Sequence, residues 1–126
     1  MHKSRLGALI IDCRTDDLPR AAAFWSAALG YPIAPPKPGD TGKYIHLTGP
    51  DGEVKIELQR VDHDSRVHLD IETDNFAAEI ARLEKLGATR VQDFARWVVL
   101  EAPSGHRFCV VNPQRPDFNE NAKEWK

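Results

Sequence analysis

Apolar and polar residues alternate along several short stretches of the chain, which is the pattern of β-strands with one buried face. In Val67 to Glu72 the apolar residues occupy every second position, so Val67, Leu69 and Ile71 are expected to cover a helix. His68, Asp70 and Glu72 then share the opposite face. The same reasoning predicts strands at residues 8–13, 31–34, 43–48, 54–60, 89–94, 97–102 and 107–112.

Two other stretches have apolar residues at the spacing of an amphipathic helix. The first stripe consists of Leu18, Ala22, Trp25 and Leu29, and the second of Phe76, Ile80, Leu83 and Leu86. Polar residues that can cap a first turn precede each stripe, namely Thr15, Asp16, Thr73 and Asp74. Gly30 and Gly87 follow the stripes and are expected to end the helices in the left-handed conformation.

The chain contains its own pattern twice. Residues 9–17 align with residues 67–75 at one offset, which matches Asp12 to Asp70, Thr15 to Thr73 and Asp16 to Asp74. Each half continues through a helix and a Pro-x-Gly turn between two strands, so each is predicted to be a βαβββ module. We expect one domain over residues 1–126, with module one at about 6–60, module two at about 66–113 and a C-terminal tail at 114–126. Phe118 and Trp125 are expected to anchor that tail.

Composition narrows the class of protein. A chain of 126 residues with 41% hydrophobic residues and a net charge of -2 is typical of one globular domain, and it lacks the basic patch of a nucleic-acid binder. No apolar run reaches the length of a membrane span. Cys13 and Cys109 have neither CxxC nor metal-finger spacing, which predicts a reducing, cytoplasmic location.

Three segments together carry a family resemblance. The segments LIIDCRTDDLPRAAAFWSAALG, VHLDIETDNFAAEIARLEKLGA and APSGHRFCVV resemble the glyoxalase-like branch of the glyoxalase/bleomycin resistance protein/extradiol dioxygenase (vicinal oxygen chelate, VOC) superfamily, over about residues 6–113. The resemblance implies an α+β fold in which the two βαβββ modules form an incomplete barrel around a cleft. The superfamily includes lyases, isomerases, ring-cleaving dioxygenases, thiol transferases and antibiotic-sequestering proteins, so fold alone does not assign an activity.

Strand alternation selects the residues that would face such a cleft. In the strand at 54–60 the apolar set is Val54, Ile56 and Leu58, and in the last strand Phe108 and Val110 are expected to be core. The predicted ligand-binding residues are therefore Ile10, Glu57, Gln59, His68, Arg107, Cys109 and Val111.

In metal-dependent members of the superfamily, first and fourth strands of both modules supply the ligands. Carried onto this chain, those positions fall on Ile10, on Glu57 or Gln59, on His68 and on Cys109. Ile10 has no donor atom, and Cys109 is softer than the usual carboxylate. Arg107 adds a positive charge beside Cys109. We therefore predict no cofactor; a bound divalent metal (Zn, Ni, Mn or Fe) would have His68, Glu57 and Cys109 as ligands.

Several of these residues have a second interpretation. His68 is the candidate catalytic residue as a proton carrier, or it is a buried histidine satisfied by Asp70 or by a backbone carbonyl. Cys109 is a nucleophile or, more commonly for buried cysteine, a small hydrophobe. Glu57 and Gln59 bind a polar group of a ligand or hold a water. Asp12 and Asp70 resemble catalytic carboxylates, but their position before the capping residues favours fixing the strand-to-helix turns. By alternation with Ile45 and Leu47, His46 can reach the cleft wall, but a lone histidine on an outer strand is usually solvated.

The preferred function is a protein that binds a small, partly apolar, anionic molecule in its cleft with a degenerate metal site. The alternative is a VOC-type lyase, isomerase or dioxygenase that acts on a vicinal-oxygen substrate with a divalent metal or with His68 as general base. The expected partner is a small molecule, with no nucleic acid and no membrane. Exposed sheet edges further predict a homodimer.

Overall fold

The computed structural model describes residues 1–126, which group into two compact units. The first unit is residues 8–67, and the second unit combines residues 1–7 with residues 68–126. Each unit contains a β-sheet with open edges and at least one helix, so the fold is mixed α+β as predicted. None of the three helices has the length and apolar character to cross a membrane.

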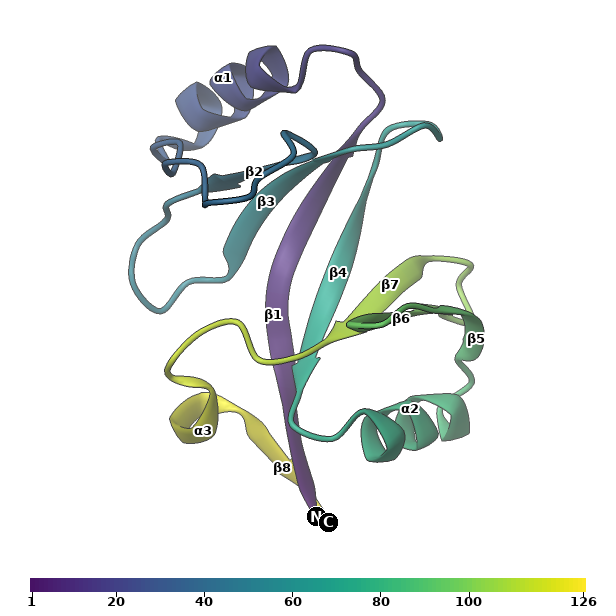
Figure 1. Cartoon of the computed structure of the whole chain (residues 1–126). Helices are drawn as coiled ribbons and strands as arrows, with labels where there is room; N and C mark the ends of the chain where they lie inside the picture. The colour runs from purple at the N-terminus through teal and green to yellow at the C-terminus, as the bar shows by residue number, and fades with distance from the viewer. The chain divides into compact units, whose positions relative to one another are not determined.

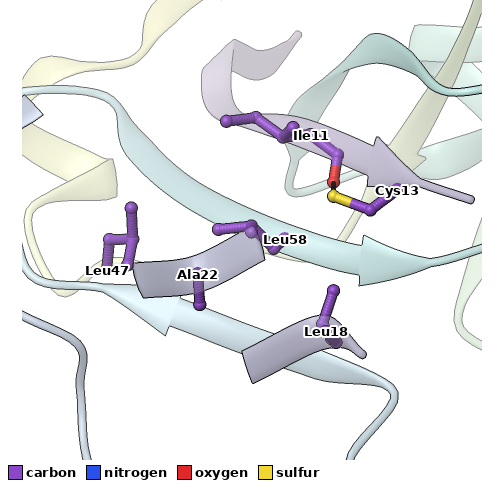
Figure 2. Close-up of a cluster of buried hydrophobic side chains, with 6 residues drawn as sticks. All are labelled: Ile11, Cys13, Leu18, Ala22, Leu47 and Leu58. Carbon is purple, nitrogen blue, oxygen red and sulfur yellow. Dashed lines mark hydrogen bonds between the residues drawn. The ribbon is translucent and has the colours of Figure 1, made fainter. Parts of the chain in front are cut away.

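The first unit consists of three paired strands and one helix (Figure 1). Its elements are the second half of β1 (His2–Cys13), α1 (Leu18–Leu29), β2 (Tyr44–Leu47) and β3 (Lys55–Arg60). β3 lies between the other two strands, parallel to β1 and antiparallel to β2. Figure 2 shows the apolar cluster between α1 and this sheet, formed by Ile11, Cys13, Leu18, Ala22, Leu47 and Leu58.

Both long helices begin later than their sequences suggested. Asp17, rather than Thr15 or Asp16, caps α1 by accepting a hydrogen bond from the Arg20 N–H at 3.2 Å. Asn75, rather than Thr73 or Asp74, caps α2 by accepting a hydrogen bond from the Ala78 N–H. The threonines instead accept the N–H groups of the capping residues, at 3.0 Å in one unit and 3.1 Å in the other. The repeat is therefore real, but its helix start is an ST turn followed by an Asx cap.

The glycine stop signals are confirmed, whereas one predicted strand is wrong. Gly30 and Gly87 have positive φ angles of 73° and 111° at the helix ends. The stretch 31–34 forms only an isolated bridge between Ile33 and Leu47. Pro32 has no N–H to donate, and its carbonyl accepts a single bond from Thr48, so a regular ladder cannot extend through it.

The second unit contains a four-stranded sheet in the order β4–β7–β6–β5. Its elements are β4 (Arg66–Thr73), α2 (Phe76–Lys85), β5 (Thr89–Asp93), β6 (Trp97–Glu101) and β7 (Arg107–Val111). β4 and β7 are parallel, and the other two pairs are antiparallel. The buried cluster beside α2 consists of Ile80, Leu83, Ala88, Val98, Leu100 and Val110.

The expectation that all apolar residues of β4 cover a helix is wrong for two of the three. Val67 and Leu69 are 51% and 43% exposed, and only Ile71 packs against the cluster of the second unit. The reason is the length of α2, whose ten residues span about 15 Å. The helix starts just after β4 and packs on β6 and β7, so it covers only the end of β4.

The tail is docked, as its two aromatic residues predicted. It forms α3 (Phe118–Asn121) and β8 (Lys123–Trp125), and β8 pairs antiparallel with the start of β1, where His2 lies opposite Trp125. Phe118 is 4% exposed. The Trp125 Nε1–H donates to Ser4 Oγ at 2.7 Å. Figure 1 accordingly marks the two chain ends side by side.

Two fully buried carboxylates lie where these terminal segments meet the second unit. Glu79 Oε1 lies 2.7 Å from His2 Nε2, and both carboxylate oxygens accept bonds from the Arg82 guanidinium at 2.9 and 2.8 Å. Burial alone would raise the pKa of Glu79, but the hydrogen bonds that it accepts outweigh burial and hold the pKa below its ordinary value. Glu79 is thus a buried anion that is fully hydrogen-bonded.

Glu72 is the second buried carboxylate. It accepts hydrogen bonds from Arg5 Nε at 2.8 Å and from the backbone N–H of Gln114 at 2.6 Å. Arg5 also donates to Asp117 at 2.8 Å, and this bond is the largest cause that lowers the pKa of Asp117 to about 2. Gly7 lies against Glu72, because a Cβ at that position would overlap the Glu72 side chain.

Candidate functional site

The sheet of the second unit has one face against α2 and one face turned away from it. Val98, Leu100 and Val110 belong to the buried cluster on the α2 side. Strand alternation therefore places their neighbours on the opposite side, here called the open face of the second unit. Its residues are His68, Asp70 and Glu72 on β4, Arg107, Cys109 and Val111 on β7, and Trp97, Val99 and Glu101 on β6.

Three chemically reactive side chains meet on this open face. Asp70 lies directly opposite Cys109 in the parallel pair of β4 and β7. His68 Nε2 lies 3.4 Å from Asp70 Oδ1, with both side chains less than one-fifth exposed. The ligand atoms of His68, Asp70 and Cys109 all lie within 4.8 Å of one another. The interpretation of Asp70 as a turn residue is therefore wrong, whereas its predicted pairing with His68 is present.

A cation and an aromatic pair lie at opposite ends of this group along β7. Arg107 lies opposite Glu101, with Nε 3.6 Å from Oε1, and both side chains are partly exposed. At the other end Val111 lies opposite Trp97. Trp97 stacks on Phe94 with ring centroids 4.7 Å apart. The predicted residues His68, Arg107, Cys109 and Val111 are thus neighbours on one face.

The remaining predicted residues belong to the equivalent face of the first unit. Ile10 lies opposite Glu57 and is 2% exposed, and Asp12 lies opposite Gln59. Asp12 lies within β1 rather than at the turn, so its interpretation as a turn residue is also wrong. The Gln59 side-chain amide donates to the Tyr44 hydroxyl at 3.1 Å.

His46 also belongs to this face, contrary to its interpretation as a solvated side chain. Its side chain is 21% exposed, and its Nδ1 lies 3.6 Å from Glu57 Oε1. Burial lowers the pKa of His46, Glu57 partly opposes this effect, and Lys55 adds to it. The signal that could have found this group was the shared alternation of two neighbouring strands, 43–48 and 54–60, which places His46 and Glu57 on the same side.

The registers of the two units settle which residues correspond. Asp12 pairs with Gln59, and its repeat partner Asp70 pairs with Cys109. Gln59, rather than Glu57, is therefore the counterpart of Cys109. By the same register Glu57 corresponds to Arg107. The histidine on β2, His46, then corresponds to Glu101 on β6. Glu57 of the first unit thus corresponds to a basic residue of the second unit, and Glu101 of the second unit corresponds to a basic residue of the first.

Comparison with known proteins identifies the family of this chain. The family model of the glyoxalase-like domain matches residues 8–111. The chain belongs to this family, and with it to the glyoxalase/bleomycin resistance/dioxygenase superfamily. No curated protein matches this glyoxalase-like chain.

Solved structures share the fold of this glyoxalase-like chain at low sequence identity. A hypothetical protein from Bacillus halodurans aligns with a TM-score of 0.62 and 14% identity, over 89% of this chain and 96% of that one. Methylmalonyl-CoA epimerase from Mycobacterium tuberculosis gives 0.56 and 16%, over 87% and 88%. A superfamily member from Vibrio splendidus gives 0.53 and 17%, over 85% and 98%. These likenesses establish the fold.

The four positions at which the superfamily resemblance places a metal do not form a complete ligand set here. The buried Ile10 side chain has no donor atom, and its counterpart in the repeat, His68, has one. Of the last-strand positions, Gln59 offers an amide oxygen, with its amide nitrogen bonded to Tyr44, and Cys109 offers a thiol. The inherited set therefore lacks a donor at one of its four positions.

Proposed function

We propose that this glyoxalase-like protein binds a small, partly apolar, anionic molecule on the open face of the second unit. Arg107 would receive the anionic group, His68 and Cys109 would contact its polar centre, and Val111 with Trp97 would cover its apolar part. The observation that carries the proposal is the order of side chains along this face, from cation to reactive group to aromatic pair.

Two physical arguments support this function. Small-molecule sites combine an apolar lining with a few convergent polar groups, and this face sets Val99, Val111 and Trp97 beside its polar side chains. A guanidinium presents several donors in a fixed plane that suits a carboxylate or phosphate. The Glu101 partner of Arg107 is partly exposed, so an arriving anion can compete for the guanidinium without leaving a buried charge unpaired.

Binding of a panel of small carboxylates with flat apolar groups, each paired with its neutral amide, tests the proposal. We expect the carboxylates alone to bind to chelator-treated protein in calorimetry. His68→Ala should weaken binding by about 1–3 kcal/mol through loss of a polar contact, and Arg107→Gln by at least as much. Arg90→Gln is the matched control, because Arg90 forms a similarly exposed ion pair with Asp93. Equal binding of acids and amides would contradict the proposal.

A second candidate function is an enzyme of the lyase or isomerase type, with His68 as general base. The observation in its favour is the carboxylate of Asp70 beside His68 Nε2, since a carboxylate that orients an imidazole is a common catalytic arrangement. Proton exchange from solvent deuterium into a bound carbonyl compound tests it by mass spectrometry. We expect the bound compound to exchange its proton for solvent deuterium, and His68→Ala to abolish this exchange. A compound that binds without any exchange would contradict the enzyme function.

We also propose that the protein is a homodimer. All five residues of β5 are exposed at the edge of the second unit, and open edges in soluble proteins are normally covered or paired. Light scattering at high micromolar concentration should give twice the 14.2 kDa chain mass. A mass of one chain at that concentration would overturn this proposal.

A further inference from the structure

His68, Asp70 and Cys109 supply one imidazole, one carboxylate and one thiol on adjacent positions of two paired strands. These are the donor types of zinc sites in proteins, and three protein ligands with one open position are typical of a catalytic zinc ion. The three donor atoms lie within 4.8 Å of one another, and tetrahedral bonds of about 2.0–2.3 Å place ligand atoms closer than that. The three side chains would therefore have to draw closer together when the ion binds.

We propose that these three side chains form a binding site for one Zn²⁺ ion, contained entirely within the second unit. The site deepens the proposed function, because the open coordination position would face the same surface that holds the organic anion. The proposal differs from the set carried over from the superfamily resemblance, in which Glu57 was the carboxylate. Here the carboxylate comes from Asp70, two residues from His68 on the same strand.

The charges of the group fit a divalent, thiolate-preferring ion. A thiolate and a carboxylate together neutralise Zn²⁺, so the half-buried site would carry no net charge with His68 neutral. The thiolate disfavours Mg²⁺ and Ca²⁺, which prefer oxygen ligands. Arg107 is the nearest cation on β7, and its ion pair with Glu101 offsets part of its repulsion toward a metal.

The first unit cannot form the same site, which makes it an internal control. The repeat counterparts of His68, Asp70 and Cys109 are Ile10, Asp12 and Gln59, which include neither an imidazole nor a thiol. Its single cysteine, Cys13, faces the apolar cluster with α1, and burial raises the pKa of that thiol. Any metal-thiolate signal from the folded chain should therefore come from Cys109.

Titration of tag-free, chelator-treated full-length protein with Co²⁺ tests the site without any organic ligand. We expect one equivalent to bind with a thiolate-to-cobalt charge-transfer band, and Zn²⁺ to abolish the band by displacing cobalt. Cys109→Ser should remove the band and Cys13→Ser should keep it. His68→Ala and Asp70→Asn should each weaken Co²⁺ binding tenfold or more. Circular dichroism and melting curves show whether each variant is folded.

Alkylation of the wild-type protein gives a measurement that needs no variant. Zn²⁺ should protect Cys109 from iodoacetamide at a stoichiometry of one, as peptide mass mapping reports, whereas Mg²⁺ should not. Absence of the charge-transfer band, or alkylation of Cys109 that Zn²⁺ does not slow, would overturn the proposal. Carboxylate binding is measured separately in chelator-treated protein. Failure of the zinc site would therefore not contradict the proposed binding of a carboxylate.

Discussion

The two units repeat one pattern but stabilise it differently. The buried cluster of the first unit consists of apolar residues and Cys13, and its ion pairs lie at partly or fully exposed positions. The second unit buries two carboxylates completely, Glu72 and Glu79. Arg5 at the start of β1 neutralises Glu72, which also accepts the backbone N–H of Gln114 in the tail. Glu79 is neutralised by Arg82 of α2 and also contacts His2 at the start of β1.

This difference shows why one unit depends on the chain termini. A buried ion pair contributes little net stability, but removal of one partner leaves an uncompensated charge. The terminal segments of the second unit therefore supply Arg5 as the counter-charge of Glu72, in addition to the buried side chain of Phe118. The first unit also buries a carboxylate, that of Asp12, but it does not include the chain termini, and the following variants exploit that contrast.

Deletion of residues 114–126 should have the largest effect. It removes the buried Phe118, the β8 strand and the backbone N–H that Glu72 accepts. Loss of a buried aromatic residue alone costs about 3–5 kcal/mol, a large part of the 5–15 kcal/mol typical of a domain. Hydrogen exchange should show opened amides in the second unit and protected ones in the first. An unchanged melting temperature would show that residues 114–126 do not stabilise the fold.

Glu72→Ala should destabilise the protein by about 3–5 kcal/mol, because the mostly buried Arg5 then keeps only its bond to the partly exposed Asp117 and the Gln114 N–H loses its acceptor. Glu57→Ala is the matched change on the first unit and should cost less than about 1 kcal/mol, since that pair is partly exposed. Urea unfolding measures both. Equal losses would show that the two units do not differ in their dependence on paired charge.

Gly7→Ala should cost about 1–3 kcal/mol through overpacking, because the added Cβ would overlap the Glu72 side chain and lie 2.8 Å from its Cδ. In a Glu72→Ala background the same change should cost much less, since the clash is gone. A double-mutant cycle from urea unfolding gives the coupling. Additive effects would contradict a direct contact.

Acid should weaken the second unit through Glu79 and Asp117. Both carboxyl groups have pKa values below their ordinary ones in the folded protein, at about 2 for Asp117. Their stabilisation is therefore present above the unfolded pKa and is lost as the pH falls from about 4.5 toward 2. Glu79→Gln should flatten this decline in urea midpoints, whereas Glu84→Gln on the exposed side of α2 should leave it unchanged.

The smallest effect is expected at His46 in the first unit. NMR titration should give an imidazole pKa below 6.5, because burial disfavours the charged form. Glu57→Gln should lower this pKa further by removing an attractive charge, and Lys55→Gln should raise it. An NMR pKa at or above 6.5 would contradict this expectation, because it would show that burial does not dominate the environment of the imidazole.

Periodicity predicted most of the elements and the faces of most strands, because alternation and helical spacing follow from burial on one side. It failed where tertiary contacts decide. Pro32 ended a predicted strand, and the short α2 left Val67 and Leu69 exposed. Asp70 looked like a turn residue because the repeat places Thr73 after it. Only the pairing of β4 with β7 brings Asp70 beside Cys109, and no local pattern encodes that neighbour.

The division of β1 between the two units has a consequence for how the chain acquires its structure. Residues 8–13 find their partner strand, β3, within the first 60 residues, so the first unit can form early during synthesis. His2, which precedes them, pairs with Trp125, near the far end of the sequence. Such long-range closure slows folding. The pairing of β1 with β8 therefore waits until translation has delivered residues 123–125.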